Sequence, residues 1–406
     1  MEKENKLGTM PISKLIINMS LPIIISMLVQ ALYNIVDSVF VSRVCEQALT
    51  AVSLAFPAQN LMIGLATGTA VGVNALMGRA LGAKDQERAN AVAINGVFLA
   101  VVGFAICAVL ALLFAGPFFR SQTQIDYIVE NGTDYLLVCC CGSLGLFCEI
   151  MFERLLQGTG RSILSMYSQG LGAIVNIVLD PIFIFVFDMG VTGAAVATVI
   201  GQFCGCILAL IFNLKKNKEI HLQFRGFRPN WRLVGNIYAI GLPSVIMVAI
   251  GSVMTFCMNK ILIAFSSTAA AVFGVYFKLQ SFVFMPVFGM NNGIVPIISY
   301  NYGAKKKKRI LGTIKLAVLF AVCIMAAGTI LFQCFPRQLL SLFSASEHMM
   351  SMGVPALRII SIHFIIAAYG IVISSVFQAL GDGMPSLIMS VSRQLVMLLP
   401  AAWLLS

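Results

Sequence analysis

The chain has 406 residues, of which 59% are hydrophobic and only 11% charged, and its mean hydropathy is +0.94. Soluble domains carry roughly 25% charged residues, so this composition excludes a soluble globular protein. The net charge of +11 does not indicate nucleic-acid binding, because the basic residues gather in alternate loops between apolar segments.

Eleven apolar segments follow one another along the chain, each long enough to cross a hydrocarbon core of about 30 Å as a helix. The sequence therefore predicts an all-α integral membrane protein. The predicted spans cover residues 17–41, 50–77, 91–115, 134–152, 163–187, 190–214, 235–264, 270–300, 311–334, 353–379 and 384–406.

Basic residues are divided unequally between the two sides of the predicted bundle. Twenty of the 27 Lys and Arg residues lie at the N-terminus or in every second loop, four lie in the opposite loops and three lie inside spans. Cytoplasmic loops of membrane proteins carry such an excess. We therefore expect a multi-pass protein of the cell membrane with a cytoplasmic N-terminus, in contact with the lipid bilayer and not with nucleic acid.

The second half of the chain repeats motifs of the first half at one constant offset of 221 positions. The recurring pairs are Leu21-Pro22 with Leu242-Pro243, Gly68 with Gly289, Gly72 with Gly293, Gly82-Ala83-Lys84 with Gly303-Ala304-Lys305, and Gln157 with Gln378. Six spans in each repeat would give both halves the same orientation in the membrane. Transporters built from two such lobes are a known architecture.

This repeat predicts two pseudo-symmetric six-helix lobes around a central cleft. We expect an N-terminal lobe over residues 1–214, a basic cytoplasmic linker over 215–234 and a C-terminal lobe over 235–406. The chain ends before the counterpart of the sixth span, so we expect the twelfth helix to be missing from it. Two lobes that rock against each other favour transport by alternating access.

Polar residues inside the apolar segments are candidates for function, because a charge at the bilayer centre costs about 2.5–3.5 kcal/mol. Gln30, Asn34 and Asp37 share one face of the first span, and Asn176 and Asp180 share one face of the fifth. The carboxylates of Asp37 and Asp180, the Asn176 amide and the carbonyl freed by the following proline could bind a hard cation such as Na⁺, or the carboxylates could exchange a proton. The alternative for Asp180 is a structural role at a helix end, because a proline follows it.

Acidic residues are unevenly shared between the halves. Residues 220–346 contain no Asp or Glu, so we expect a carboxylate site for a coupling cation in the first lobe. Glu149 and Glu153 are expected to reach the cytoplasmic interface with their charges. We predict that Gln30 and Asn34 of the first lobe line the substrate cleft together with Lys278, Gln280 and His363 of the second lobe. The alternatives for Lys278 are snorkelling or a structural hydrogen bond to a carbonyl of a broken helix.

Enzyme signatures are absent from the sequence. It contains no HExxH, GxSxG, Walker or GxGxxG motif and only three His. We therefore expect no catalytic residues and no cofactor, with Na⁺ or H⁺ as the coupling ion.

Several separated motifs resemble the multidrug and toxic compound extrusion (MATE) family of efflux transporters, prokaryotic type. They are Leu21-Pro22, then Gln30, Asn34 and Asp37 with Phe40-Val41, then Gly82-Ala83, Gln157-Gly158-Thr159-Gly160, and Asn176 with Leu179-Asp180-Pro181. The resemblance runs from about residue 15 to the end of the chain. It implies twelve helices in two lobes and export of organic cations in exchange for Na⁺ or H⁺.

The same resemblance implies roles for individual residues. In prokaryotic members the first-lobe cation site uses positions that match Asp37, Tyr135, Asn176, Asp180 and Thr198, of which Asp37, Asn176 and Asp180 would be the Na⁺ ligands. Some members instead use acids of the second lobe, which this chain lacks. We expect small, cationic amphiphilic substrates and a monomeric carrier. The alternative is a flippase for a lipid-linked oligosaccharide of the same superfamily, which would need several Arg residues in its cleft.

Overall fold

The computed structural model describes residues 5–224, 226–265, 267–343 and 347–404. Within these ranges the chain folds into helices joined by short loops, and these ranges contain no strand. The α-helices are α1 (Lys6–Thr9), α2 (Ile12–Ser42), α3 (Glu46–Gly82), α4 (Gln86–Arg120), α5 (Asp126–Cys141), α6 (Leu144–Gly158), α7 (Ser162–Pro181), α8 (Gly190–Lys215), α9 (Trp231–Phe265), α10 (Ser267–Gly303), α11 (Lys307–Cys334), α12 (Pro336–Ser341), α13 (Glu347–Ser361), α14 (Phe364–Ala379), α15 (Met384–Val391) and α16 (Leu399–Leu404). Two π-helical segments, η1 (Ile182–Val186) and η2 (Ser392–Leu398), continue α7 and α15.

The helices confirm the all-α membrane fold. Eight of the described helices are long and apolar enough to cross a membrane, and two helix pairs bent at a short break bring the number to ten if each pair is taken as one span. The fourth and tenth spans are therefore not the single helices that the sequence predicts, because α5 and α6 meet at 44° and α13 and α14 at 49°. The eleventh consists of α15, η2 and α16 in succession, and its described apolar part, Met384–Leu398, is shorter than the others.

The boundaries of equivalent helices are separated by the same offset of 221 positions as the sequence motifs, or nearly so. Helices α3 and α10 both contain 37 residues, and both their starts and their ends lie 221 positions apart. The two bends are equivalent to within one residue, because α5 ends at Cys141 and α13 ends at Ser361. Lys84 and Lys305 follow α3 and α10 with the same left-handed backbone, at φ 60° and 56°. Equal sequence spacing has therefore produced equal local structure.

Helices α3 and α10 meet backbone to backbone at their C-terminal ends. A Cβ on Gly82 would lie only 1.9 Å from the carbonyl oxygen of Tyr300, and a Cβ on Gly303 would lie 2.0 Å from the carbonyl oxygen of Arg79. Each contact is the other one shifted by the repeat offset. Glycine is required at both positions because any side chain would overlap the facing helix.

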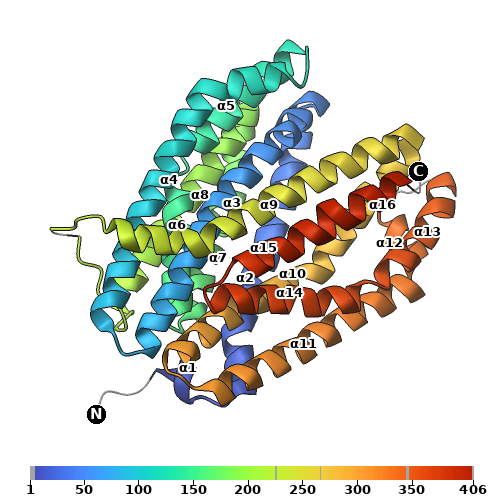
Figure 1. Ribbon diagram of the computed structural model, residues 1–406. Coiled ribbons are helices and arrows are strands. Elements are labelled where there is room, and N and C mark those ends of the chain that lie inside the picture. Colours follow the sequence, from blue (N-terminus) through green and yellow to red (C-terminus); the bar gives the residue numbers. More distant parts are fainter. Residues whose placement is uncertain (1–4, 225, 266, 344–346, 405–406) are drawn as a thin grey trace.

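One turn before Gly82, two residues that are equivalent in the repeat touch each other. A Cβ on Gly78 of α3 would lie 2.8 Å from the Cβ of Ser299 of α10, and these two residues are repeat equivalents. A contact between equivalent residues marks the pseudo-twofold axis that relates the halves. From this crossing the halves extend in different directions, with α4 and α5 rising at the left of the view and α11 to α13 extending to the right (Figure 1).

Helix α1 joins the two halves at the same end of the molecule. Leu7 is fully buried there. On one side the amide of Asn5 donates to the carbonyl of Thr159 in the first half, at 3.2 Å. On the other side Asn301 and Arg309 of the second half donate to the carbonyl of Leu7, at 2.9 and 3.2 Å. The segment before α2 thus forms a hydrogen-bonded bridge between the halves.

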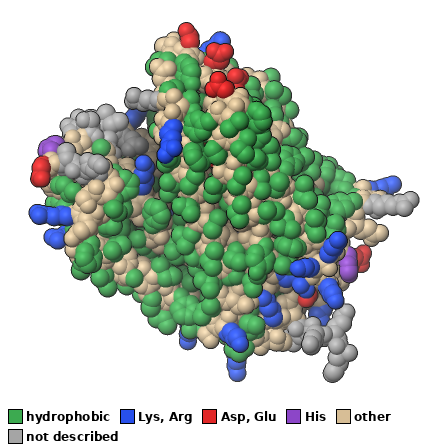
Figure 2. Space-filling view, turned by 180° about the vertical axis from the view of Figure 1, so that it is seen from behind, with side chains coloured by type: hydrophobic (Ala, Val, Ile, Leu, Met, Phe, Trp, Pro, Cys, Tyr) green, Lys and Arg blue, Asp and Glu red, His purple; other side chains and the backbone are tan. Residues whose placement is uncertain are grey.

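The surface has the distribution expected of a protein in a bilayer. Figure 2 shows a broad hydrophobic area across the middle of the face, with Asp and Glu gathered at the top and many Lys and Arg along the lower edge. Large apolar side chains such as Leu112, Ile174 and Ile366 are more than 60% exposed. Apolar exposure on this scale is stable in lipid and not in water.

Candidate functional site

A polar group lies inside the first half, between α2, α7 and α8. Asn176 and Asp180 stand one turn apart on the inner face of α7 and are 2% and 0% exposed. Helix α2 contributes Asp37, which is close enough to Asp180 for the two carboxylates to interact electrostatically. Helix α8 contributes Thr198. Four residues from three helices therefore meet in one apolar surrounding.

The amide of Asn176 holds this group together. Its Nδ2 donates to Oγ1 of Thr198 at 3.1 Å and to Oδ1 of Asp180 at 3.4 Å. An amide nitrogen has two protons to donate, so both are used. The amide oxygen is consequently turned away from these partners.

Three oxygens of the group are buried and have no hydrogen-bond partner among the described residues. They are Oδ1 of Asp37, Oδ1 of Asn176 and Oδ2 of Asp180. Leaving a buried acceptor unsatisfied costs about 1–3 kcal/mol, and more when it is charged. A proton or a hard cation would remove that cost, and oxygen donors are the ligands that hard cations prefer.

The backbone of α7 changes its winding directly after Asp180. Pro181 has no N–H, so it cannot donate to the carbonyl four residues earlier. The chain then continues as the π-helix η1, in which the N–H of Phe187 donates to the carbonyl of Ile182 at 2.9 Å. Single π-helical turns are frequent at functional sites, and this one re-aims the residues that follow the carboxylate.

Tyr135 of α5 borders the group and is only 3% exposed. It interacts electrostatically with Asp37, and its hydroxyl accepts a hydrogen bond from Nε2 of Gln59 at 3.3 Å. The sequence interpretation missed Gln59. The signal was available, because Gln59 and its neighbour Asn60 are amides within the apolar run of α3, and intramembrane polar residues usually face the interior.

The remaining predicted residues of α2 lie in different surroundings. Oε1 of Gln30 accepts from Nε2 of Gln169 on α7 at 3.3 Å, so Gln30 ties α2 to the helix that carries Asp180. Asn34 is exposed on the surface of α2. Gln169 is a second polar residue that the sequence interpretation missed.

The predicted residues of the second half do not join this group. The Nζ atom of Lys278 lies 6.0 Å from the centre of the Phe343 ring, and Lys278 is exposed. His363 is also exposed and packs against Phe284 and Phe364 of its own half. Gln280 is half-buried on α10.

The expectation that Glu149 and Glu153 reach the cytoplasmic interface with their charges is wrong. Both are 8% exposed, so they are buried and do not extend to the interface. Oε1 of Glu153 accepts from the hydroxyl of Ser168 at 3.3 Å, and a Cβ on Gly205 would lie 2.0 Å from Oε1 of Glu149. The glycine on α8 leaves room for a carboxylate inside the bundle, which position along the helix alone did not indicate.

The donor set differs from that of a transition-metal site. Among the described residues, no group of three or more His, Cys, Asp or Glu could hold a metal ion. Two carboxylates, an amide and a hydroxyl are instead the neutral and anionic oxygens typical of sites for hard cations.

Comparisons with known proteins identify relatives of the whole chain. The family model MatE matches the chain twice, over residues 22–182 and 243–404. The multidrug export protein MepA of Staphylococcus aureus is 25% identical over 394 residues, which are 96% of this chain and 86% of that protein. MepA of Staphylococcus haemolyticus is 26% identical over 396 residues, which are 95% and 86% of the two chains.

Solved structures share the whole fold. The outward-facing conformation of a multidrug resistance MATE family transporter of the MOP superfamily has a TM-score of 0.93 and 28% identity, and the match covers 100% of this chain and 90% of that one. A MOP superfamily transporter from Pyrococcus furiosus has a TM-score of 0.94 at the same identity and coverage.

Proposed function

This chain belongs to the MatE family, and on that premise we propose that it is a secondary active antiporter that exports organic cations in exchange for Na⁺ or H⁺. Members of the family are transporters, and the relatives include multidrug export proteins. The observation that carries the proposal is the set of three buried, unpartnered oxygens on Asp37, Asn176 and Asp180.

The coupling step would follow from the charge of this group. Two carboxylates in an apolar surrounding repel each other, and a proton or Na⁺ between them relieves the repulsion. The occupied group is neutral or nearly so, and the empty group is anionic. A site that binds its ion in one arrangement of α2, α7 and α8 and releases it in another can drive alternating access.

The lobes would be closed at the crossing of α3 and α10 in one part of the cycle and would separate there in the other. We propose the division into lobes 1–214 and 235–406 joined by the linker 215–234, and a monomer with its N-terminus in the cytoplasm. The substrates would be small cationic amphiphiles held between the lobes. Lys278, Gln280 and His363 are proposed to face them in part of the cycle.

The decisive experiment is transport by the purified chain in vesicles. A fluorescent organic cation is loaded, and its export is followed under an imposed Na⁺ gradient, an imposed pH gradient, both or neither. We expect export to require one of the two gradients and to stop when an ionophore collapses it. Equal export in all four conditions would contradict antiport.

The same assay identifies the coupling ion. Coupling to Na⁺ predicts that export persists at uniform pH, and coupling to H⁺ predicts that it persists without Na⁺. Asp126→Asn at the exposed start of α5 serves as a control for loss of a carboxylate outside the site. That variant should export like the unmodified chain.

A further inference from the structure

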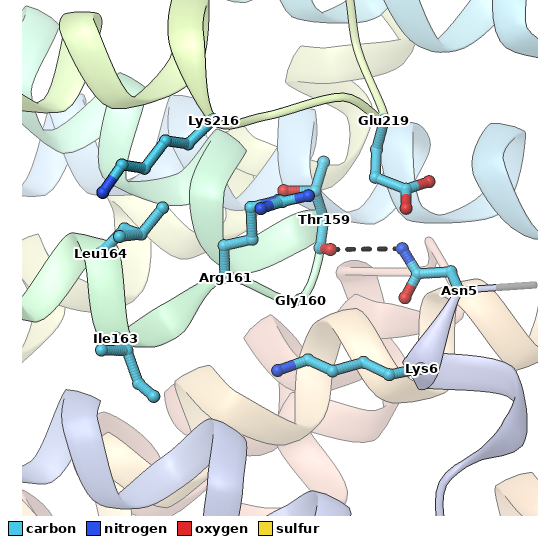
Figure 3. Close-up of a pocket in the computed structure, with 9 residues that line it drawn as sticks. All are labelled: Asn5, Lys6, Thr159, Gly160, Arg161, Ile163, Leu164, Lys216 and Glu219. Carbon is cyan, nitrogen blue, oxygen red and sulfur yellow. Dashed lines mark hydrogen bonds between the residues drawn. The ribbon is translucent and has the colours of Figure 1, made fainter. Parts of the chain in front are cut away.

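A cavity of ≈ 460 Å³ lies at the end of the molecule where α1 bridges the halves. It is lined by Asn5, Lys6, Thr159, Gly160, Arg161, Ile163, Leu164, Lys216 and Glu219 (Figure 3). Its volume is within the roughly 300–1,000 Å³ of sites for small ligands. In the view, Lys216 lies above and Lys6 below Arg161. The charged side chains of the lining are therefore three cations, Lys6, Arg161 and Lys216, and one acid, Glu219.

These cations are not neutralised by the protein. Among the described residues, none of the three forms an ion pair with Glu219, and the Arg161 guanidinium has no hydrogen-bond partner. Lys6 donates to Oδ1 of Asn18 at 2.6 Å, which is a neutral acceptor. Burial and the nearby charge of Arg161 lower the pKa of Lys6. The charges of Lys6 and Arg161 are thus held near each other against their mutual repulsion. The Nζ atom of Lys216 lies 5.2 Å from the centre of the Phe212 ring, at the rim of the same cavity.

The N-terminus of α7 adds to the positive potential. Arg161 is the N-cap residue of this 20-residue helix, and no side chain caps its first N–H groups. A helix N-terminus carries about half a positive charge and normally favours an acidic or neutral capping residue. An arginine is therefore electrostatically unfavourable at this position unless an anion accompanies it.

The repeat provides an internal comparison. The equivalent of Arg161 in the second half is Asp382, directly before the N-terminal region of α15. Gly160 and Gly381 share a left-handed backbone, at φ 87° and 76°, so the two turns have the same form. The second half thus has an acid one residue before its N-cap, Gly383, where the equivalent turn of the first half has an arginine at the N-cap. Lys306 also caps a helix, α11, but its Nζ donates to a backbone carbonyl at 3.1 Å.

We propose that this cavity binds a phosphate-type oxyanion, through Lys6, Arg161, Lys216 and the N-terminus of α7. Guanidinium and helix N-terminal N–H groups are the donors that phosphate oxygens prefer. The ligand is either the headgroup of an anionic phospholipid or a free phosphate ion, since the cavity lies at the end of the α2 and α7 spans. Because Lys6 belongs to α1, the bound anion would also stabilise the bridge between the halves.

The test uses the full chain with two probes. In detergent, inorganic phosphate is titrated against chloride at equal ionic strength. In nanodiscs, phosphatidylcholine alone is compared with equal parts of phosphatidylcholine and phosphatidylglycerol. The readouts are the thermal midpoint and the number of anions retained in native mass spectrometry. A response to phosphate identifies a free oxyanion as sufficient, and a response to phosphatidylglycerol alone identifies a lipid headgroup.

Variants decide whether the effect belongs to this cavity. We expect Arg161→Gln to weaken binding by about tenfold, the loss of one charge-assisted contact. Arg161→Asp, which copies the residue of the second half, should abolish it. The control is Lys218→Gln, an exposed lysine of the same loop that does not line the cavity, and it should bind normally.

Two results would overturn the proposal. One is an unmodified chain that responds to neither probe. The other is equal binding by Arg161→Gln and Lys218→Gln. If Arg161→Gln does not fold, Lys6→Gln is judged by the same criterion, because its side chain lines the same cavity.

Discussion

At the scale of single residues, the oxygens of Asp37, Asn176 and Asp180 are the feature that ordinary folding does not explain. A protein that only needed to pack α2 against α7 would be more stable with apolar side chains there, because buried charges are costly to desolvate. Retaining two carboxylates and an unsatisfied amide oxygen favours a role in binding.

Asp37→Asn tests this role. The amide has nearly the shape of the carboxylate, so the variant should insert and fold, and loss of a buried charge can even increase stability. It can neither take up a proton nor offer Na⁺ a negative charge. We expect gradient-driven export to be lost while the thermal midpoint stays equal or rises. Full export by the variant in gradient-clamped vesicles would show that coupling occurs elsewhere.

Thr198→Val tests the hydrogen bond that orients the amide. Valine keeps the volume of threonine but removes the Oγ1 that accepts from Asn176. The amide is then free to turn, and a contribution of about 1–1.5 kcal/mol is lost. We expect the half-saturating concentration of the coupling ion to rise about tenfold.

The matched control is Thr192→Val on the same helix. Thr192 lies outside the polar group, so this variant should leave the ion dependence unchanged. If the two variants behave alike, the orienting role of Thr198 is refuted.

At the scale of elements, the contacts of α3 with α10 depend on glycine. Gly82 and Gly303 each face a backbone carbonyl closer than a side chain permits. The halves close at this end because the two helices approach without intervening side chains. Helix packing in membranes uses small residues in this way, since lipid provides no hydrophobic force between helices.

Gly82→Ala should disturb that closure. The added methyl group would lie 1.9 Å from the Tyr300 oxygen, and overpacking of this kind costs about 1–3 kcal/mol. We expect a lower thermal midpoint and greater labelling of cysteines introduced at the crossing. Gly235→Ala on α9 is the control, because nothing lies within 4 Å of its Cβ. Equal effects of both variants would mean that α3 and α10 do not need to touch.

At the scale of the whole molecule, the repeat places the same contact on both sides of the pseudo-twofold axis, as Gly82 with Tyr300 and Gly303 with Arg79. Gly78 and Ser299 are equivalent residues in contact across the pseudo-twofold axis. Any motion that opens this end of the molecule must separate them. The bridge through α1 must also be released, because it is bonded to both halves.

A disulfide between Gly78→Cys and Ser299→Cys should therefore arrest the cycle. The Cβ atoms start 2.8 Å apart, and a small outward shift reaches the roughly 3.5–4.5 Å of a disulfide. In a background without other cysteines, oxidation should stop export and reduction should restore it. Export by the fully oxidised protein would show that the crossing does not open during transport.

The sequence by itself determined the membrane class, the positions of the eight long apolar helices, the repeat and the family. These follow from hydropathy and spacing, which act along the chain and need no knowledge of neighbours. It also indicated Asp37, Asn176 and Asp180, because a carboxylate or amide in an apolar span is conspicuous. Their role in coupling and the division into lobes stay predictions.

Only the tertiary structure decided which side chains meet. Gln59 joins Tyr135 across two helices, and Glu149 is buried because a glycine of another helix makes room for it. In the sequence, Arg161 is one of many basic residues in loops. Only the fold places it beside Lys6 and at the N-terminus of α7, which no side chain caps. Hydropathy fixes that a helix enters the membrane, whereas the rotation and depth of each helix are set by packing against its neighbours.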